Sequence, residues 1–129
     1  MPEPLQLREV APSGLLMVMR LGSETLGDKA LAVQSSRTFE RWGFYGFSVF
    51  EVPGGDWRML ARLQPLILDR PKVLTAEAPR LLAAGFPIFP TLNHPHWTVV
   101  LSEPSAGQFA RVRDVFDGPI DNPVWTPRR

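Results

Sequence analysis

Residues 45–52, which read YGFSVFEV, decide the fold class, because they are the strongest strand signal in the chain. Aromatic and β-branched residues fill this stretch, and such side chains favour the pleated surface of a sheet. Residues 53–55 (PGG) then end the strand as a turn, and Asp56 is placed to cap a helix that begins at Trp57. The stretch predicts a strand, a turn and a helix in direct succession.

Upstream of this strand, the sequence predicts a second strand and a helix. Residues 15–21 (LLMVMRL) are nearly all apolar, which predicts a strand covered on both faces. Residues 23–42 contain no proline, start with Ser23 as an N-cap and end before Gly43, so we predict a helix between the two strands. An irregular, proline-containing arm over residues 1–14 precedes them.

Downstream of the turn, further helices and strands follow. Residues 57–63 predict a short helix that buries Trp57, Leu60 and Leu63 at a spacing of three. The remaining expected elements are a strand over 72–75, a helix over 77–84, a proline-broken edge segment over 86–91, a strand over 96–102, a helix capped by Ser105 that carries Phe109, Val112 and Phe116, and an irregular tail over 118–129.

The order of these elements, β-α-β-α-β-α-β-β-α, predicts an α+β domain in which a single-layered mixed β-sheet packs against helices. The chain has 129 residues, 44% of them hydrophobic, and shows no repeat or interdomain linker. We therefore expect one domain over residues 1–129, with the arm and the tail lying over its surface.

Composition limits the classes of function. The net charge of +1 creates no global field that would recruit nucleic acid or a membrane, so such binding would need a local patch. The absence of cysteine excludes disulfides, thiol nucleophiles and cysteine-ligated metals. Arginine far outnumbers lysine, as in GC-rich bacterial genomes. The N-terminus lacks a signal peptide and Arg20 interrupts the first apolar run, so we expect a cytoplasmic protein without a membrane partner.

The two histidines of the chain are the main functional indication, because His94 and His96 lie two residues apart where a loop enters a strand. Histidine titrates near neutral pH and serves as an acid or base. If the segment around Pro95 is extended, both rings lie on one side. No third ligand accompanies them, so we predict no metal and no other cofactor, and purely structural histidines remain an alternative.

Arg20 is the leading partner for the histidines, because arginine at the end of a buried strand is costly unless it is paired. It would stabilise negative charge developing on a substrate, although an ion pair with Glu24 or Glu51 is an equal alternative. Tyr45, the only tyrosine, completes the candidate catalytic set. Strand alternation places Tyr45 on one face and Ser48 on the other, which assigns Ser48 to packing.

Arg111 and Arg113 on the last helix are candidate binding residues, which would form a basic patch if the tail with Arg128 and Arg129 folds back on them. A solvated helix face is the simpler interpretation. The dense aromatic residues of the chain are likewise explained by core packing more readily than by a surface that stacks bases.

The layout of an arginine ending a first strand, a helix, and a strand with a serine resembles that of the ADP-ribosyltransferases. The resemblance carries over Arg20 alone, since the Ser-Thr-Ser triplet is missing and Glu77 and Glu103 fall in a helix and a turn. The runs GFYGFSVFEVPGGDW and PHWTVVL are similar to an uncharacterised family of small actinobacterial proteins, which implies a small accessory protein without an assigned activity.

Two functions from different classes stay open. The first is the toxin of a toxin-antitoxin pair, a bacterial enzyme that acts on RNA or a nucleotide through His94, His96, Arg20 and Tyr45. The second is a non-catalytic interaction module, such as an antitoxin, immunity or assembly protein, that binds a protein partner encoded nearby. A cavity into which both Arg20 and His96 open would favour the first.

Overall fold

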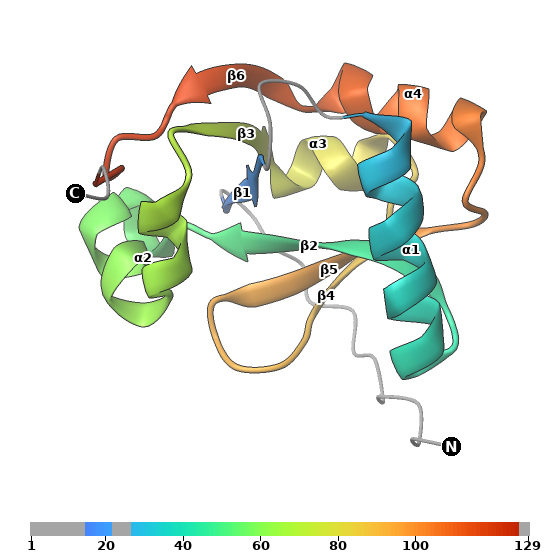
Figure 1. Ribbon diagram of the computed structural model, residues 1–129, viewed down its shortest axis with the longest axis horizontal. Coiled ribbons are helices and arrows are strands. Elements are labelled where there is room, and N and C mark those ends of the chain that lie inside the picture. Colours follow the sequence, from blue (N-terminus) through green and yellow to red (C-terminus); the bar gives the residue numbers. More distant parts are fainter. Residues whose placement is uncertain (1–14, 22–26, 127–129) are drawn as a thin grey trace.

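Six strands form one sheet in the order β4-β5-β2-β1-β3-β6 (Figure 1). The computed structural model describes residues 15–21 and 27–126, so the arm over 1–14, the expected cap at Ser23 and the last residues, Arg128 and Arg129 included, lie outside the described part. The strands are β1 (Leu16–Arg20), β2 (Tyr45–Glu51), β3 (Lys72–Glu77), β4 (Ile88–Pro90), β5 (His96–Leu101) and β6 (Asp117–Asp121).

The α+β class is confirmed, whereas the expectation of a mixed sheet is wrong, because every described strand pair is antiparallel. The chain leaves β1 and enters β2 at the same end of the sheet, so the intervening helix α1 (Asp28–Trp42) does not act as a crossover between parallel strands. Strand and helix order alone does not distinguish these two connections.

The helices bury both faces of the sheet. One face carries Met17, Met19, Phe47 and Val99, and it packs against α3 (Ala78–Ala83) and α4 (Ala106–Val115). The opposite face carries Val18, Phe50 and Val73, which pack against α2 (Trp57–Leu63) and the 3-10 turn η2 (Pro65–Asp69). The prediction that the first strand is covered on both faces is confirmed.

Two predicted helix caps are also present. The Asp56 carboxylate accepts hydrogen bonds from the backbone N–H groups of Arg58 and Met59, after the 3-10 turn η1 (Pro53–Gly55). Ser105 Oγ accepts one from Gln108 at the start of α4. The predicted burial of Leu63 is wrong, since its side chain is 44% exposed. Because α2 has only two turns, Leu60 fills the core there and Ile67 of η2 supplies the next buried side chain.

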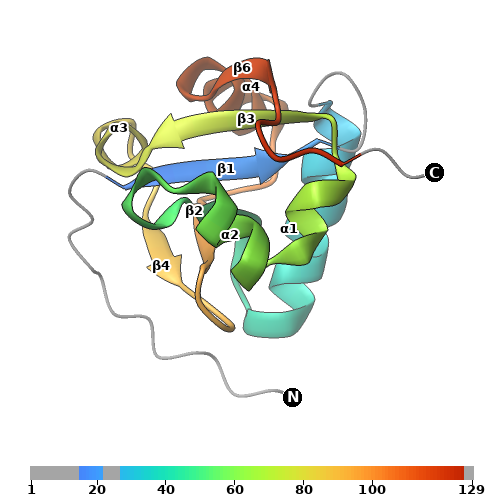
Figure 2. The ribbon, with the colours of Figure 1, turned by 90° about the vertical axis from the view of Figure 1, so that its left-hand side faces the viewer.

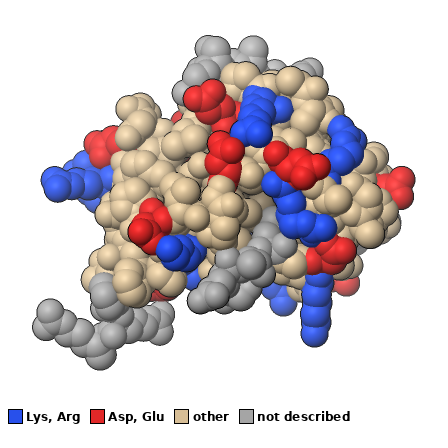
Figure 3. Space-filling model, turned by 90° about the horizontal axis from the view of Figure 1, so that it is seen from above, with Lys and Arg blue, Asp and Glu red and all other residues tan. Residues whose placement is uncertain are grey.

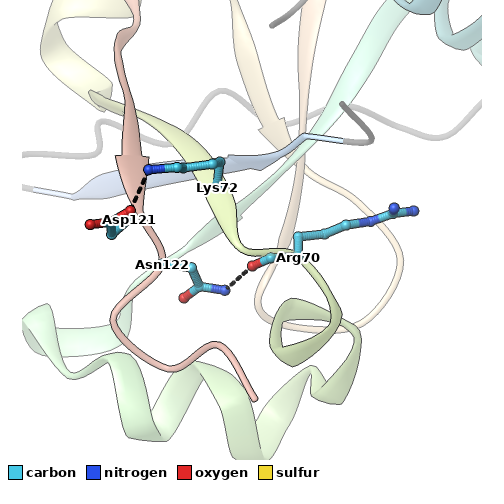
Figure 4. Close-up of polar contacts among 4 residues, drawn as sticks. All are labelled: Arg70, Lys72, Asp121 and Asn122. Carbon is cyan, nitrogen blue, oxygen red and sulfur yellow. Dashed lines mark hydrogen bonds and ion pairs between the residues drawn. The ribbon is translucent and has the colours of Figure 1, made fainter. Parts of the chain in front are cut away.

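The expectation of an irregular tail from residue 118 is wrong over its first part, because β6 pairs with β3 at the edge of the sheet. Gly118 adopts a φ of 119°, and Pro119, which lacks an N–H group, is tolerated on an edge strand. Figure 4 shows how this end is held: Lys72 forms an ion pair with Asp121, and Asn122 Nδ2 donates to the carbonyl oxygen of Arg70 at 2.8 Å.

Helix α1 stands beside the end of β1 where the strand finishes at Arg20 (Figure 2). Its Thr38 Oγ donates to the carbonyl oxygen of Gly46 at 2.9 Å, and its Gln34 Oε1 accepts from the backbone N–H of Ser48 at 3.3 Å. These bonds fix α1 against β2. None of the described helices is long and apolar enough to cross a membrane.

Candidate functional site

Arg20, Ser48 and His96 lie on one face of the sheet, on three neighbouring strands. The register pairs Val18 with Phe50, and Phe50 with His96. Residues two positions apart in a strand share a face, so Arg20 lies on the side of Val18 and Ser48 on the side of Phe50. The sheet thus brings together an arginine, a serine and a histidine that are distant in sequence.

A cavity of about 830 Å³ lies between this face and α1. Arg20 and His96 both line it, and so does Ser48. The lining also contains four further cationic side chains, and among the described lining residues none carries a carboxylate. The cations are Arg20, Lys29, Arg37, Arg41 and Arg70.

A chain of hydrogen bonds fixes the His96 ring in the cavity. His96 Nδ1 lies 3.2 Å from the Thr91 carbonyl oxygen, which can only accept and so favours the tautomer with the proton on Nδ1, whereas the Thr91 hydroxyl can bond either tautomer. Nε2 is then an acceptor, and it lies 2.9 Å from Ser48 Oγ, which donates to it. Thr91 Oγ1 lies 2.8 Å from Nδ1 and 2.7 Å from Thr98 Oγ1, which completes the chain.

The surroundings favour the neutral form of His96. Burial lowers the pKa of this imidazole, and the positive charges of Arg41 and Arg20 lower it further, against the opposing effect of the bond to the Thr91 carbonyl. A neutral ring whose Nε2 accepts a hydrogen bond from the Ser48 hydroxyl has the arrangement of a general base next to a nucleophile.

The charged form of Arg20 is disfavoured by its surroundings. Burial lowers the pKa of its guanidinium, as does the charge of Arg70, while Asp69 acts in the opposite direction. The guanidinium carbon lies 5.8 Å from the centre of the Phe50 ring, which forms part of the cavity lining. Arginine does not lose its proton under these conditions, so the lowered pKa means that an anion beside Arg20 would be stabilised.

Helix α1 contributes the other concentration of charge. Residues at helical spacing, among them Gln34, Arg37, Thr38 and Arg41, face the cavity from one side of the helix. Arg37 and Arg41 are four residues apart, where like charges on a helix repel each other. Arg41 also lies with its guanidinium carbon 5.2 Å from the ring centre of Trp42, another lining residue.

Leu92 lines the cavity in a backbone conformation that leucine rarely adopts. Its φ is 55°, in the left-handed region, and its side chain is 53% exposed. This backbone conformation costs a bulky residue about 1–3 kcal/mol of folding free energy, and it persists only where the surrounding structure enforces it. Such strain often accompanies functional sites, and here it directly follows Thr91, which orients His96.

The expectation that both histidines lie on one side is wrong. His94 Nδ1 lies 3.4 Å from Glu51 Oε1, which also accepts a hydrogen bond from Trp97 Nε1 at 3.0 Å. Glu51 and Ser48 fall on opposite faces of β2, so the two rings diverge. Strand alternation does not apply to His94, because β5 begins only at His96.

Tyr45, Arg111 and Arg113 do not line the cavity. Tyr45 lies on the opposite face of β2 from Ser48, and its ring stacks on Phe39 with the centres 4.6 Å apart. Arg111 donates to the Ala84 carbonyl and lies over the Phe86 ring, and Arg113 pairs with Asp28 of α1. The structure therefore assigns these arginines to contacts between elements, and the tail residues that would complete a basic patch lie outside the described part.

Sequence reasoning missed several residues of the cavity. It assigned Ser48 to packing and gave no role to Lys29, Arg37, Arg41 or Arg70. The four-residue spacing of Arg37 and Arg41 was an available signal, because it places two cations on one helix face. Nothing local in the sequence indicates that this face lies opposite Arg20.

Within residues 15–21 and 27–126, no group of three or more His, Asp or Glu side chains is arranged to hold a metal ion. No family model, curated protein or solved structure matches the chain.

Proposed function

We propose that this chain is a small enzyme that binds a phosphate-bearing substrate of the nucleotide or RNA class in the cavity and acts on it with Ser48 and His96. The observation that carries the proposal is the 2.9 Å Ser48–His96 hydrogen bond in a cavity lined by five cationic side chains. Guanidinium groups match phosphate oxygens in charge and geometry, and five cationic side chains suit a phosphate with more than one negative charge better than a single carboxylate.

In the proposed reaction, His96 Nε2 takes the Ser48 proton while Ser48 Oγ forms a bond to phosphorus. The bond from phosphorus to the leaving oxygen breaks, and His96 gives its proton to that oxygen. Water then forms a bond to phosphorus as His96 takes one of its protons. The bond from phosphorus to Ser48 Oγ breaks, and His96 gives the proton to Oγ, which releases the phosphoryl product and restores Ser48. The arginines stabilise the charge on the transferring group, and Thr91 keeps the His96 proton on Nδ1.

The test is phosphate-ester cleavage by the purified chain, with nucleotides and short single-stranded RNA as substrates. Ser48→Ala and His96→Asn should each lower turnover by about 10²- to 10⁴-fold, because each removes one partner of the reacting pair. Asn at position 96 keeps a donor towards Thr91 and removes the base, so the fold should persist.

The matched control is His94→Ala, which removes the histidine outside the cavity and should leave turnover unchanged. Equal activity of Ser48→Ala and the unmodified chain would overturn the proposal, as would no cleavage of any phosphate ester by the unmodified chain. Thermal unfolding of each variant verifies that the comparison is made between folded proteins.

The biological role proposed for this activity is that of a bacterial toxin, acting in the cytoplasm and neutralised by a protein partner encoded nearby. Expression of the unmodified chain should then arrest growth, and Ser48→Ala should relieve the arrest. Normal growth during expression of the unmodified, folded chain would contradict the toxin role while leaving the enzymatic proposal to the cleavage assay.

A non-catalytic interaction module is the second candidate, supported by apolar side chains that α2 and η2 expose. Met59, Leu63 and Leu66 are 36%, 44% and 50% exposed. This function predicts that a partner purifies with the chain in fixed stoichiometry and that Leu63→Ser with Leu66→Ser abolishes the association. Turnover of a phosphate ester by the isolated chain would count against it.

A further inference from the structure

The cavity carries more positive charge than one phosphate group can neutralise. A phosphate monoester brings at most about two negative charges, whereas five cationic side chains line the cavity. Four of these cations form two groups: Arg20 and Arg70, here called the sheet-side pair, and Arg37 and Arg41, here called the helix-side pair. Lys29 of α1 is the fifth. Arg70 is close enough to affect the pKa of Arg20, and Arg37 and Arg41 lie one helical turn apart.

The Ser48–His96 pair lies within reach of both groups. Arg20 lies on the same sheet face as His96, and Arg41 lines the same cavity from α1, so the Ser48–His96 pair has a member of each group in its cavity. Ser48 Oγ is bonded to that imidazole and lines the same cavity. An anion with charge on only one side of Ser48 would leave the cations on the other side of the cavity without a phosphate contact.

Apolar side chains complete the lining. Val33 is 42% exposed and Leu92 53% exposed, and both border the cavity together with Trp42 and Phe50. Exposed apolar groups beside a cationic cluster suit a ligand that has a planar or apolar body in addition to its charges. Inorganic polyphosphate lacks such a body, and a nucleoside polyphosphate has one.

Outside the cavity, the face of the described residues that Figure 3 shows carries no continuous positive track for a polynucleotide. The five cavity cations belong to a chain with 14 basic and 13 acidic residues, so the remainder is net acidic (14 − 5 = 9 basic against 13 acidic). Figure 3 shows acidic and basic side chains interspersed over the upper face. Binding of a long strand draws on phosphate contacts outside a single cavity.

From the charge count, the two arginine pairs and the apolar lining, we infer that the substrate is a nucleoside polyphosphate whose neighbouring phosphoryl groups bridge the sheet-side and helix-side pairs across Ser48. This inference rests on the proposed function for the identity of the site, and it adds the substrate class. The nucleoside part lies against Val33, Trp42 and Leu92.

The test is calorimetric titration of the Ser48→Ala variant, which retains the cations and cannot turn the ligand over by the proposed route. A nucleoside diphosphate should bind at least tenfold more tightly than the matching monophosphate and than inorganic pyrophosphate. Arg41→Ala should remove most of the advantage of the diphosphate over the monophosphate. Arg62→Ala, which changes an arginine of α2 that does not line the cavity, is the matched control and should have no effect.

Equal affinity for mono- and diphosphate, or an equal loss in the Arg62→Ala variant, would overturn the inference. Tighter binding of an RNA oligonucleotide without terminal phosphates would overturn it in favour of a polynucleotide. The outcome is separable from that of the proposed function. Tight diphosphate binding with no cleavage by the unmodified chain contradicts the reaction alone, whereas cleavage without preference for a diphosphate contradicts this inference alone.

Discussion

His96 has a position determined by four hydrogen-bonding groups rather than by its strand alone. The Thr91 carbonyl and hydroxyl lie within hydrogen-bond distance of Nδ1, and Ser48 Oγ is bonded to Nε2. Thr98, which lies in β5 with His96, is bonded to the Thr91 hydroxyl. A buried polar group that lost these partners would cost about 1–3 kcal/mol. The arrangement therefore stabilises one tautomer of the ring, the one in which Nε2 can accept a proton.

The lowered pKa of His96 predicts an acid-dependent loss of stability. The unfolded chain binds the proton near the ordinary value of 6.5, and the folded chain binds it only at lower pH. The stabilisation is fully present above pH 6.5 and declines as pH falls towards the folded-state pKa, by at most about 1.4 kcal/mol per pH unit.

Urea unfolding from about pH 7.5 to pH 5 measures this effect. The His96→Asn variant lacks the titrating group, so its stability should fall less steeply with decreasing pH than that of the unmodified chain. Parallel profiles of the two proteins would show that His96 makes no such contribution. A steeper fall in the variant would mean that the shift has the opposite sign.

At the scale of elements, β2 is the centre of the site. It pairs with β1 and β5, supplies Ser48, and accepts or donates the two bonds that fix α1. Gly46 permits the approach of β5, because a Cβ atom there would lie 2.4 Å from the Val99 carbonyl oxygen. Real Cβ contacts are not that short, so one strand would have to move.

Gly46→Ala should therefore destabilise the fold by about 2–3 kcal/mol, through displacement of β5 and with it His96. Gly107→Ala is the matched control, since a Cβ there meets only Ser105 Oγ at 4.0 Å and alanine favours the helix interior by about 0.5–1 kcal/mol. Equilibrium denaturation should move in opposite directions for the two variants. A neutral Gly46→Ala would contradict the close strand packing.

The sequence predicted elements that depend on local signals and missed those that depend on distant partners. Residues 45–52 and the cap at Asp56 were evident from residue type and spacing, and both are present. β6 was missed because Gly118 and Pro119 indicate irregular chain unless β3 offers an edge. Leu63 was misplaced because helical spacing does not show where a two-turn helix leaves the core.

The difference between local signals and distant partners also explains which residues of the site could be predicted. Arg20 and His96 were identified from residue type, and the structure brings them to one cavity. Ser48 was set aside because strand alternation separates it from Tyr45, an inference that holds within β2. Only the register between three strands shows that Ser48 shares a face with Arg20 and His96. That register is a non-local property, as is the placement of α1 opposite the sheet.

At the scale of the whole molecule, charge is distributed unevenly although the net charge is only +1. Ion pairs such as Arg80–Asp117 and Arg113–Asp28 join elements on the outside of the molecule. The described lining of the cavity contains cationic side chains and no carboxylate. Repulsion across the cavity opposes the packing of α1 against the sheet. Folding stability should then depend on what screens or neutralises these charges.

Increasing sodium chloride from about 0.02 M to 0.5 M should raise the melting temperature in the absence of phosphate, because salt screens the repulsion. Pyrophosphate at matched ionic strength should raise it further by binding between the arginine pairs. The double variant Arg37→Gln with Arg41→Gln should show a smaller response to both. An unchanged melting temperature in pyrophosphate would contradict anion binding in the cavity.

Because the two histidines lie on opposite faces of the sheet, positions 94 and 96 should vary differently during evolution. Exchange of His96 removes a hydrogen-bond partner from both Ser48 and Thr91, because the ring is bonded to each of them. Among the described residues, the polar contact of His94 is with Glu51, whose carboxylate also accepts a hydrogen bond from Trp97. Among descendants of a common ancestor, position 94 should drift with position 51, while position 96 stays constant for as long as selection preserves the cavity.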